Sequence, residues 1–176
     1  QFHTSIEERS AFNDRCATEE HLYETDIDWS GIFNYHLGAG KISPCYIIDS
    51  PKLLNGWRNK LQKQNILVEE KFDWSNCIVN KSCVIYKDIR ATKIICCEGS
   101  ASLHNPYFSL LPFSLNKGEA LIANIPGLLQ TNIYKHRYKL IPSGAQSFWI
   151  GASFEWKYDN ILPTNIFLQN VTNHLS

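Results

Sequence analysis

Two adjacent cysteines, a glutamate and a glycine end a short apolar run in the stretch KIICCEGSAS, residues 93–102. Cys96 and Cys97 could bind a soft metal or take part in redox chemistry, because both functions use a thiolate. Zinc sites and thioredoxin-like redox sites usually contain C-x-x-C pairs, however, and the chain contains none. The pattern therefore favours a strand that stops where something large must fit, with the cysteines as small buried residues at its end.

The sequence GAGK, residues 38–41, has some features of a phosphate-binding loop. A P-loop requires glycine at the place of Tyr35 and serine or threonine at the place of Ile42, and a dinucleotide fingerprint requires glycine at Ser43. We therefore interpret these residues as a turn. The histidines lack metal-ligand spacing, and the chain has no G-x-S-x-G nucleophile motif. These patterns predict no catalytic residue and no metal site.

Aromatic and basic side chains are concentrated in the last third of the chain. The aromatic residues could form the core of a sheet or the wall of a ligand pocket; they are Tyr134, Tyr138, Phe148, Trp149, Phe154 and Trp156. The basic residues could form the solvated face of a strand or bind an anionic substrate; they are Lys135, His136, Arg137 and Lys139. The sequence supports both alternatives for each set.

Composition places the chain among globular proteins: 44% of the 176 residues are hydrophobic and 19% are charged. Lys+Arg and Asp+Glu both number 17, and this balance argues against a nucleic-acid partner, which would need a basic surplus. No apolar run approaches the ~20 residues that span a bilayer, and the polar start is unlike a signal peptide. We expect a cytoplasmic protein with free thiols. Because the chain contains no methionine, we also expect it to be a processed or excised piece of a longer protein.

Helix and strand patterns divide the chain into a centre and two flanks. A capping box that starts at Ser5 predicts a helix over residues 5–17. A second helix is capped by Ser50, has Pro51 as its first residue and ends near Asn65. Strands are predicted at residues 31–37, 66–72, 82–86 and 93–97. The consecutive apolar residues of the last one fit a strand buried on both faces, as in a mostly parallel sheet.

After Gly99 the predicted strands become longer and are separated by Gly-Pro turns, one of them at residues 142–144. They cover residues 117–125, 132–141 and 147–152, and Pro163 opens a last helix. The fold class we predict is α+β / α/β. The flanks, residues 1–37 and 101–176, would form one mixed-sheet domain, and residues 38–100 would be inserted into it.

Three segments of the chain resemble, in their order and spacing, conserved segments of one enzyme family. They are ATKIICCEGSAS (residues 91–102), LNKGEALI (115–122) and YKLIPSGAQSFWIGASFE (138–155). They are similar to the strand-and-turn, the (R/K)-G-(Q/E) strand and the late hairpin of the D-amino-acid oxidase and glycine oxidase group of FAD-dependent oxidoreductases. The resemblance covers residues 38–160. The chain departs from it at Thr92, Cys97 and Ala101, where the family carries Asp, Ala and Trp.

The resemblance also shows which parts of the family pattern are missing. The N-terminal glycine fingerprint of the Rossmann fold is absent, as is the C-terminal segment with the arginine that binds the substrate carboxylate. This sequence therefore resembles the middle of such a protein. The resemblance implies that the full-length protein is the enzyme, and that the isolated fragment is inactive and holds no FAD.

The resemblance implies that residues 38–100 are the central piece of a Rossmann-like FAD-binding domain, and that the flanks form the substrate domain. FAD would accept a hydride from the carbon that carries the amine of a small-molecule amine or amino acid. The cofactor-binding residues would be Phe72, Cys97, Glu98 and Gly99. The substrate pocket would contain Tyr138 and Trp149, and no residue is assigned a role as chemical acid or base.

Two alternatives belong to other functional classes. The zero net charge, the aromatic strands and the lack of a self-contained catalytic constellation are also typical of a non-enzymatic mixed-sheet binding or interaction module. The second alternative is a related flavoenzyme, such as a tRNA-modifying or dehydrogenase member.

Overall fold

The computed structural model describes residues 1–175, which form two units. The first, which we call the sheet unit, joins residues 1–47 to residues 116–175, and the second, the insert unit, consists of residues 48–115. The sequence placed the corresponding boundaries after residues 37 and 100, and both divisions lie later in the structure. Each unit combines helices with antiparallel strands in open sheets, which agrees with an α+β class at a coarse level.

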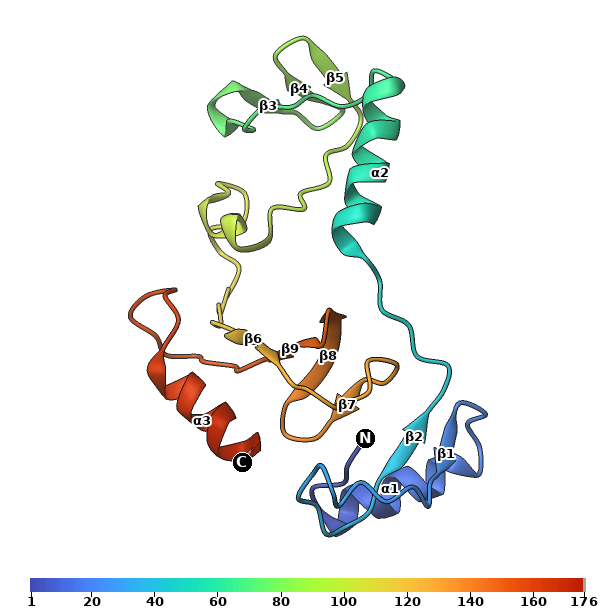
Figure 1. Cartoon of the computed structure of the whole chain (residues 1–176). Coiled ribbons are helices and arrows are strands. Elements are labelled where there is room, and N and C mark those ends of the chain that lie inside the picture. The colour runs from blue at the N-terminus through green and yellow to red at the C-terminus, as the bar shows by residue number, and fades with distance from the viewer. Residues whose placement is uncertain (176) are drawn as a thin grey trace. The chain divides into compact units, whose positions relative to one another are not determined.

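A four-stranded antiparallel sheet forms the centre of the sheet unit (Figure 1). Its strands, in spatial order, are β6 (Ala120–Asn124), β9 (Ser147–Gly151), β8 (Lys139–Gly144) and β7 (Tyr134–Lys135). A two-residue loop joins β8 to β9, and Ala145 and Gln146 both have positive φ angles (46° and 65°), as a type I′ turn requires. The turn predicted at residues 142–144 is therefore wrong. Those residues belong to β8, whose pairing shifts between Pro142 and Gly144.

The N-terminal segment continues the sheet unit beyond the edge strand β7. The backbone N–H of Phe2 donates to the carbonyl of Lys135 at 2.7 Å, and Phe2 also forms a bridge with Ala39. Residues that follow this bridge pair as an antiparallel ribbon of β1 (Leu22–Glu24) and β2 (Gly40–Ile42). A backbone hydrogen bond thus ties Phe2 to strand β7, 133 residues later in the chain.

Helix α1 (Ile6–Cys16) forms where the sequence predicts it. Ser5 Oγ accepts the N–H of Glu8 at 3.1 Å, while the Glu8 carboxylate accepts a backbone N–H one residue earlier than a capping box requires. Phe12 is the buried side chain of the helix and lies against Gly40. A Cβ at Gly40 would be 2.2 Å from the Phe12 ring, so the helix can pack this closely only against glycine.

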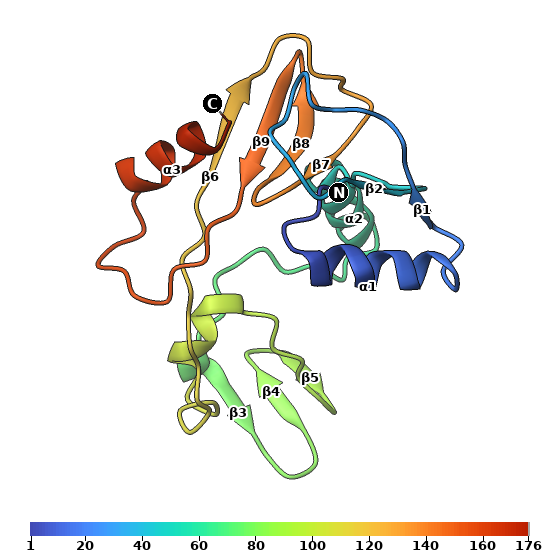
Figure 2. The same ribbon diagram turned by 90° about the horizontal axis from the view of Figure 1, so that it is seen from below.

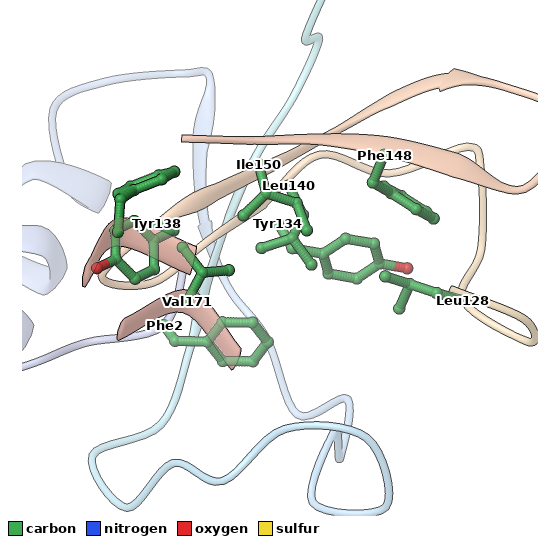
Figure 3. Close-up of a cluster of buried hydrophobic side chains, with 9 residues drawn as sticks. Phe2, Leu128, Tyr134, Tyr138, Leu140, Phe148, Ile150 and Val171 are labelled. Atoms are coloured by element: carbon green, nitrogen blue, oxygen red, sulfur yellow. The ribbon is translucent and has the colours of Figure 1, made fainter. Parts of the chain in front are cut away.

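One buried cluster holds the sheet unit together (Figure 3). It consists of Phe2, Leu128, Tyr134, Tyr138, Leu140, Phe148, Ile150, Phe167 and Val171. Phe167 and Val171 come from α3 (Asn165–Leu175), which lies along one side of the sheet (Figure 2). Phe148 and Ile150 are completely buried, whereas Trp149 between them is only half-buried, because alternate residues of a strand face opposite ways. The core therefore covers one face of the sheet.

The insert unit contains one α-helix, two 3₁₀ helices and a small antiparallel sheet. The elements are α2 (Ser50–Lys63), β3 (Cys77–Val79), β4 (Val84–Tyr86), β5 (Ile89–Ala91) and the 3₁₀ helices η1 (Trp74–Asn76) and η2 (Gly99–His104). Asp49 caps α2 in place of the predicted Ser50, and Asn65 adopts the expected left-handed conformation after its end. Helix α2 buries none of its side chains: Leu53, Leu54 and Trp57 are all more than half exposed. Across residues 1–175, no helix has both the length and the apolar character needed to cross a membrane.

Three predicted strands do not form in the described part of the chain. Residues 31–37, 66–72 and 93–97 pair with no other strand, and a strand needs a partner to satisfy its backbone groups. The prediction that residues 93–97 are buried on both faces of a parallel sheet is wrong. Ile95 is 86% exposed, and every strand pair described is antiparallel.

Two histidines connect α3 to the sheet. The predicted strand over residues 132–141 is interrupted, because the N–H of His136 bonds to the carbonyl of Tyr138 and the chain turns between β7 and β8. His136 Nδ1 then lies 2.8 Å from His174 Nε2 of α3. The ring planes are inclined by only 11° with centroids 4.8 Å apart, so the rings meet edge to edge through an N–H···N hydrogen bond. Such a bond needs one unprotonated nitrogen, so it cannot form when both rings are charged.

We expect this pair to make the sheet unit acid-sensitive. Burial lowers the pKa of both rings; the neighbouring ring and Arg137 lower that of His174 further, and Glu8 opposes the shift at His136. The unfolded chain then binds more protons near pH 6, so stability falls as the pH drops below about 6.5. The melting temperature of a His174→Gln variant should fall less between about pH 7.5 and 5 than that of the wild type. A His104→Gln control should follow the wild type, and parallel curves for His174→Gln would contradict the expectation.

Candidate functional site

The candidate site lies in the insert unit, where an aromatic cluster surrounds Phe72. The Phe72 ring stacks on Tyr86 with a centroid distance of 4.2 Å and an angle of 19°. Trp74 meets Phe72 edge-on at 4.9 Å and packs against Tyr107 at 5.4 Å. The Tyr86 hydroxyl also accepts the backbone N–H of Asp73 at 3.3 Å. Strand β4 and the segment that follows α2 thus hold Phe72 in a fixed position.

Glu98 joins this cluster through two hydrogen bonds. Trp74 Nε1 donates to one carboxylate oxygen at 3.1 Å, and Asn105 Nδ2 donates to the other at 2.7 Å. Asn105 is 1% exposed, and its Oδ1 accepts the N–H of Tyr107. Since both oxygens of Glu98 are engaged, this carboxylate anchors the turn at the start of η2. The predicted residues Phe72 and Glu98, far apart in the sequence, therefore belong to one structural cluster with Trp74 between them.

Gly99 begins η2 in the left-handed region, with φ +57°. A Cβ at this position would have no other atom within 4 Å, so the backbone is open on that side. Cys96 is half-buried and Cys97 is exposed, and all six cysteines are free thiols. The prediction that both are buried residues at the end of an inner strand is wrong, because residues 93–97 have no partner strand to cover them. In this turn the open backbone of Gly99 is adjacent to an accessible Cys97.

A cavity of about 320 Å³ opens beside Phe72. Its walls are mostly apolar and come from the segment after α2 and from the β4–β5 hairpin: Val68, Glu70, Phe72, Val84, Tyr86, Ile89, Ala91, Lys93 and Ile94. Glu70 forms an ion pair with Lys87 at 2.7 Å, and this hydrogen bond holds the pKa of Glu70 below its usual value. Aromatic faces with a few polar groups at the rim are suited to bind a flat ring system.

The two predicted pocket residues lie in the sheet unit and on opposite faces of its sheet. Tyr138 is buried among the core residues, edge-on to Phe167 at 5.8 Å and to His174 at 5.6 Å. Trp149 pairs directly with Ile122 on one side and Ile141 on the other. Directly opposed residues share a face, so these three side chains form an apolar row on the face that the core does not cover. The structure does not bring Tyr138 and Trp149 together.

Trp74, Tyr86 and Asn105 belong to the candidate site and were not predicted from the sequence. The run F-D-W, residues 72–74, was a usable signal, because alternate aromatics at the end of a strand-like segment can face one site. Asn105 gave no signal, since its role depends on a hydrogen bond to Glu98. Within residues 1–175, no three His, Cys, Asp or Glu side chains gather as a metal site would require. The groups present can bind and orient a ligand.

Substitution by alanine is expected to change the stability of the insert unit in opposite directions at two of its glycines. Gly99→Ala should destabilise the unit by about 1 kcal/mol, because a side chain raises the energy of the left-handed conformation. Gly56→Ala, inside α2 and with open space around its Cα, should stabilise it by about 1 kcal/mol. Urea unfolding of the two variants measures both. Equal signs would show that the φ angle of Gly99 does not matter.

No protein-family model matches the chain, and no solved structure matches it.

Proposed function

We propose that this chain is part of a flavin-dependent oxidoreductase that oxidises an amine or amino acid by hydride transfer to FAD. The observation that carries the proposal is the placement of the first resembling segment. Its residue Glu98, which precedes Gly99, shares one cluster with Phe72, which the resemblance also assigns to the cofactor. The order of the three segments, residues 91–102, 115–122 and 138–155, supports the same family.

The insert unit would be the central piece of a Rossmann-like FAD-binding domain. Its helix α2 supports this role, because the apolar stripe of Leu53, Leu54 and Trp57 is suited to cover a sheet and covers none among the described residues. The cavity beside Phe72 and the open backbone at Gly99 fit part of a large planar cofactor. FAD, when bound, supplies the hydride acceptor, and the substrate becomes an imine.

In this proposal the sheet unit holds the substrate. Trp149, Ile122 and Ile141 form an apolar row that can exclude water from a substrate and orient it. Residues Phe72, Trp74 and Glu98 would fix the turn whose backbone approaches the cofactor. None of these side chains is assigned proton transfer, because the contacts of Glu98 are those of a structural anchor.

Anaerobic titration of the full-length protein with a panel of amines and amino acids tests the proposal. A substrate should bleach the flavin absorbance, and the corresponding carboxylic acid without the amine should leave it unchanged. Bleaching by a substrate of another class, such as a hydroxy acid, would instead assign the chain to a related flavoenzyme.

The apolar row on the open face of the sheet favours a second candidate, a non-enzymatic binding module. Trp149 and its partners Ile122 and Ile141 could bind an apolar ligand without any cofactor. Amine binding by a full-length protein that contains no flavin would favour this candidate over the oxidoreductase.

A further inference from the structure

A groove of about 630 Å³ lies within the sheet unit, whereas the candidate cofactor site belongs to the insert unit. It is lined by residues around β1 and β2 and by the approach to β7, on both sides of the N-terminal bridge between Phe2 and Ala39. Apolar groups contribute most of its surface, among them Ile27, Trp29 and Ile133. A groove of this size, with an apolar floor, is typical of small-molecule sites.

Three lysines from separate strands line this groove: Lys41 of β2, Lys135 of β7 and Lys139 of β8. None of the described residues that line it is an aspartate or a glutamate. Lys135 and Lys139 are directly opposed in the antiparallel ladder, an arrangement in which like charges repel. Two lysines of the basic set noted in the sequence, Lys135 and Lys139, thus lie side by side at a groove that Lys41 also lines.

Glu8, whose carboxylate interacts electrostatically with Lys135, does not line the groove. Glu8 of α1 has its carboxylate bound by Thr4 and by the side-chain amide of Gln1. The same Gln1 amide accepts a hydrogen bond from Lys135 Nζ at 3.2 Å, and so bridges this lysine and Glu8. Lys41 Nζ lies 5.9 Å from the Tyr23 ring centroid, and within residues 1–175 Lys41 forms no ion pair. The groove therefore has a surplus of positive charge.

We propose that this groove binds a small organic anion with at least two anionic oxygen groups on an apolar body. The opposed Lys135 and Lys139 and the third lysine on β2 can bind separate anionic groups, while Trp29 and its apolar neighbours in the groove contact the apolar body. The site is independent of the flavin proposal, since Phe72 and Gly99 belong to the other unit. Carboxylates and phosphate esters share this chemistry.

Isothermal titration with isophthalate, an aromatic dicarboxylate, tests the proposal on the whole protein. We expect binding that weakens as salt is added, and none with the neutral isophthalamide at the same concentration. Lys139→Gln should weaken isophthalate binding about tenfold, because a hydrogen bond to a charged group is lost. Lys157→Gln, an exposed lysine of the same unit outside the groove, is the matched control and should bind like the wild type.

Three results would overturn the inference: no isophthalate binding at millimolar concentration, equal binding of isophthalamide, or unchanged affinity in Lys139→Gln. If Lys139→Gln does not fold, the salt dependence of wild-type binding and the comparison with isophthalamide still test whether the groove binds the ligand through its charge. Titration with inorganic phosphate, an anion without an apolar body, shows how much of the affinity comes from charge alone. Binding as tight as that of isophthalate would show that the apolar floor contributes nothing, and would contradict the proposed ligand class.

Discussion

A Glu119→Gln variant is expected to melt at a temperature lower by roughly 10 °C or more, the largest effect of any charge substitution in the sheet unit. Glu119 and Lys117 form an ion pair at 3.0 Å, and both side chains are almost completely buried. Glutamine keeps the shape of Glu119 and removes its charge, so the Lys117 ammonium would remain buried without a counterion. An uncompensated buried charge is among the most destabilising changes in a protein.

The same pair fastens the start of α3 to the sheet. Glu119 accepts the backbone N–H of Thr164 at 2.7 Å and its hydroxyl at 2.9 Å, and Lys117 Nζ donates to the Leu162 carbonyl at 2.6 Å. The melting temperature of Glu119→Gln measures this connection. Glu24→Gln, which alters an exposed residue of strand β1, is the control and should melt within about 2 °C of the wild type. Equal melting of the two variants would show that the buried pair does not stabilise the unit.

The lowered pKa of Glu119 also predicts how the stability of the wild type depends on pH. The Thr164 N–H lowers the pKa most, burial opposes it, and Lys117 lowers it further, from 4.5 to about 2. Because the folded value lies below the unfolded one, the stabilisation is present above about pH 4.5 and is lost as the pH falls towards 2. The stability of Glu119→Gln should depend less on pH across this window than that of the wild type.

Glu98→Ala is expected to destabilise the insert unit by about 2 kcal/mol, because it leaves the buried Asn105 amide and the Trp74 N–H without an acceptor. Hydrogen exchange measured segment by segment should show lost protection at residues 99–105. Glu70→Ala, which breaks the exposed ion pair with Lys87, is the control and should leave that protection unchanged.

Glu98→Gln tests whether both hydrogen bonds to the Glu98 carboxylate contribute to stability. The glutamine amide has one acceptor oxygen, so it can keep one of the two hydrogen bonds, and the loss of stability should be about half that of Glu98→Ala. Full protection of residues 99–105 in Glu98→Ala would show that the carboxylate does not anchor the turn.

Features set by neighbours in the sequence were predicted well. The cap at Ser5, the proline at the start of α2 and the left-handed Asn65 depend on backbone chemistry within one turn of helix, and the structure has all three. The strands of the late hairpin also form, although its loop is displaced to Ala145 and Gln146. Local chemistry was therefore sufficient for the main helices and for the two strands of the late hairpin, β8 and β9.

Features that depend on distant partners were missed. The apolar run at residues 93–97 has the composition of a buried strand, but burial requires a neighbouring strand, and Ile95 is exposed without one. Spacing along the chain did not indicate that His136 meets His174, or that Glu98 binds both Trp74 and Asn105. The KGE segment, residues 117–119, was identified by resemblance. The sequence did not indicate that Lys117 and Glu119 form a buried ion pair, or that Glu119 binds the distant Thr164.

The structure changes the interpretation of the stretch KIICCEGSAS, residues 93–102, in two respects. Its thiols, which the sequence predicted as buried residues, are a half-buried Cys96 and an exposed Cys97. Its carboxylate is an anchor with both oxygens engaged, and the group open to a ligand is the backbone at Gly99. The proposed cofactor contact is therefore a backbone contact supported by Trp74 and Phe72.

The visible spectrum of the protein purified from its complete gene tests the central claim most directly. We predict a flavin spectrum with about one FAD per chain, and a lower FAD content in a Glu98→Ala variant that still folds, because the turn at Gly99 would lose its anchor. A full-length protein that is colourless after purification, and that takes up no FAD when incubated with it, would contradict the assignment of the insert unit to a flavin-binding domain.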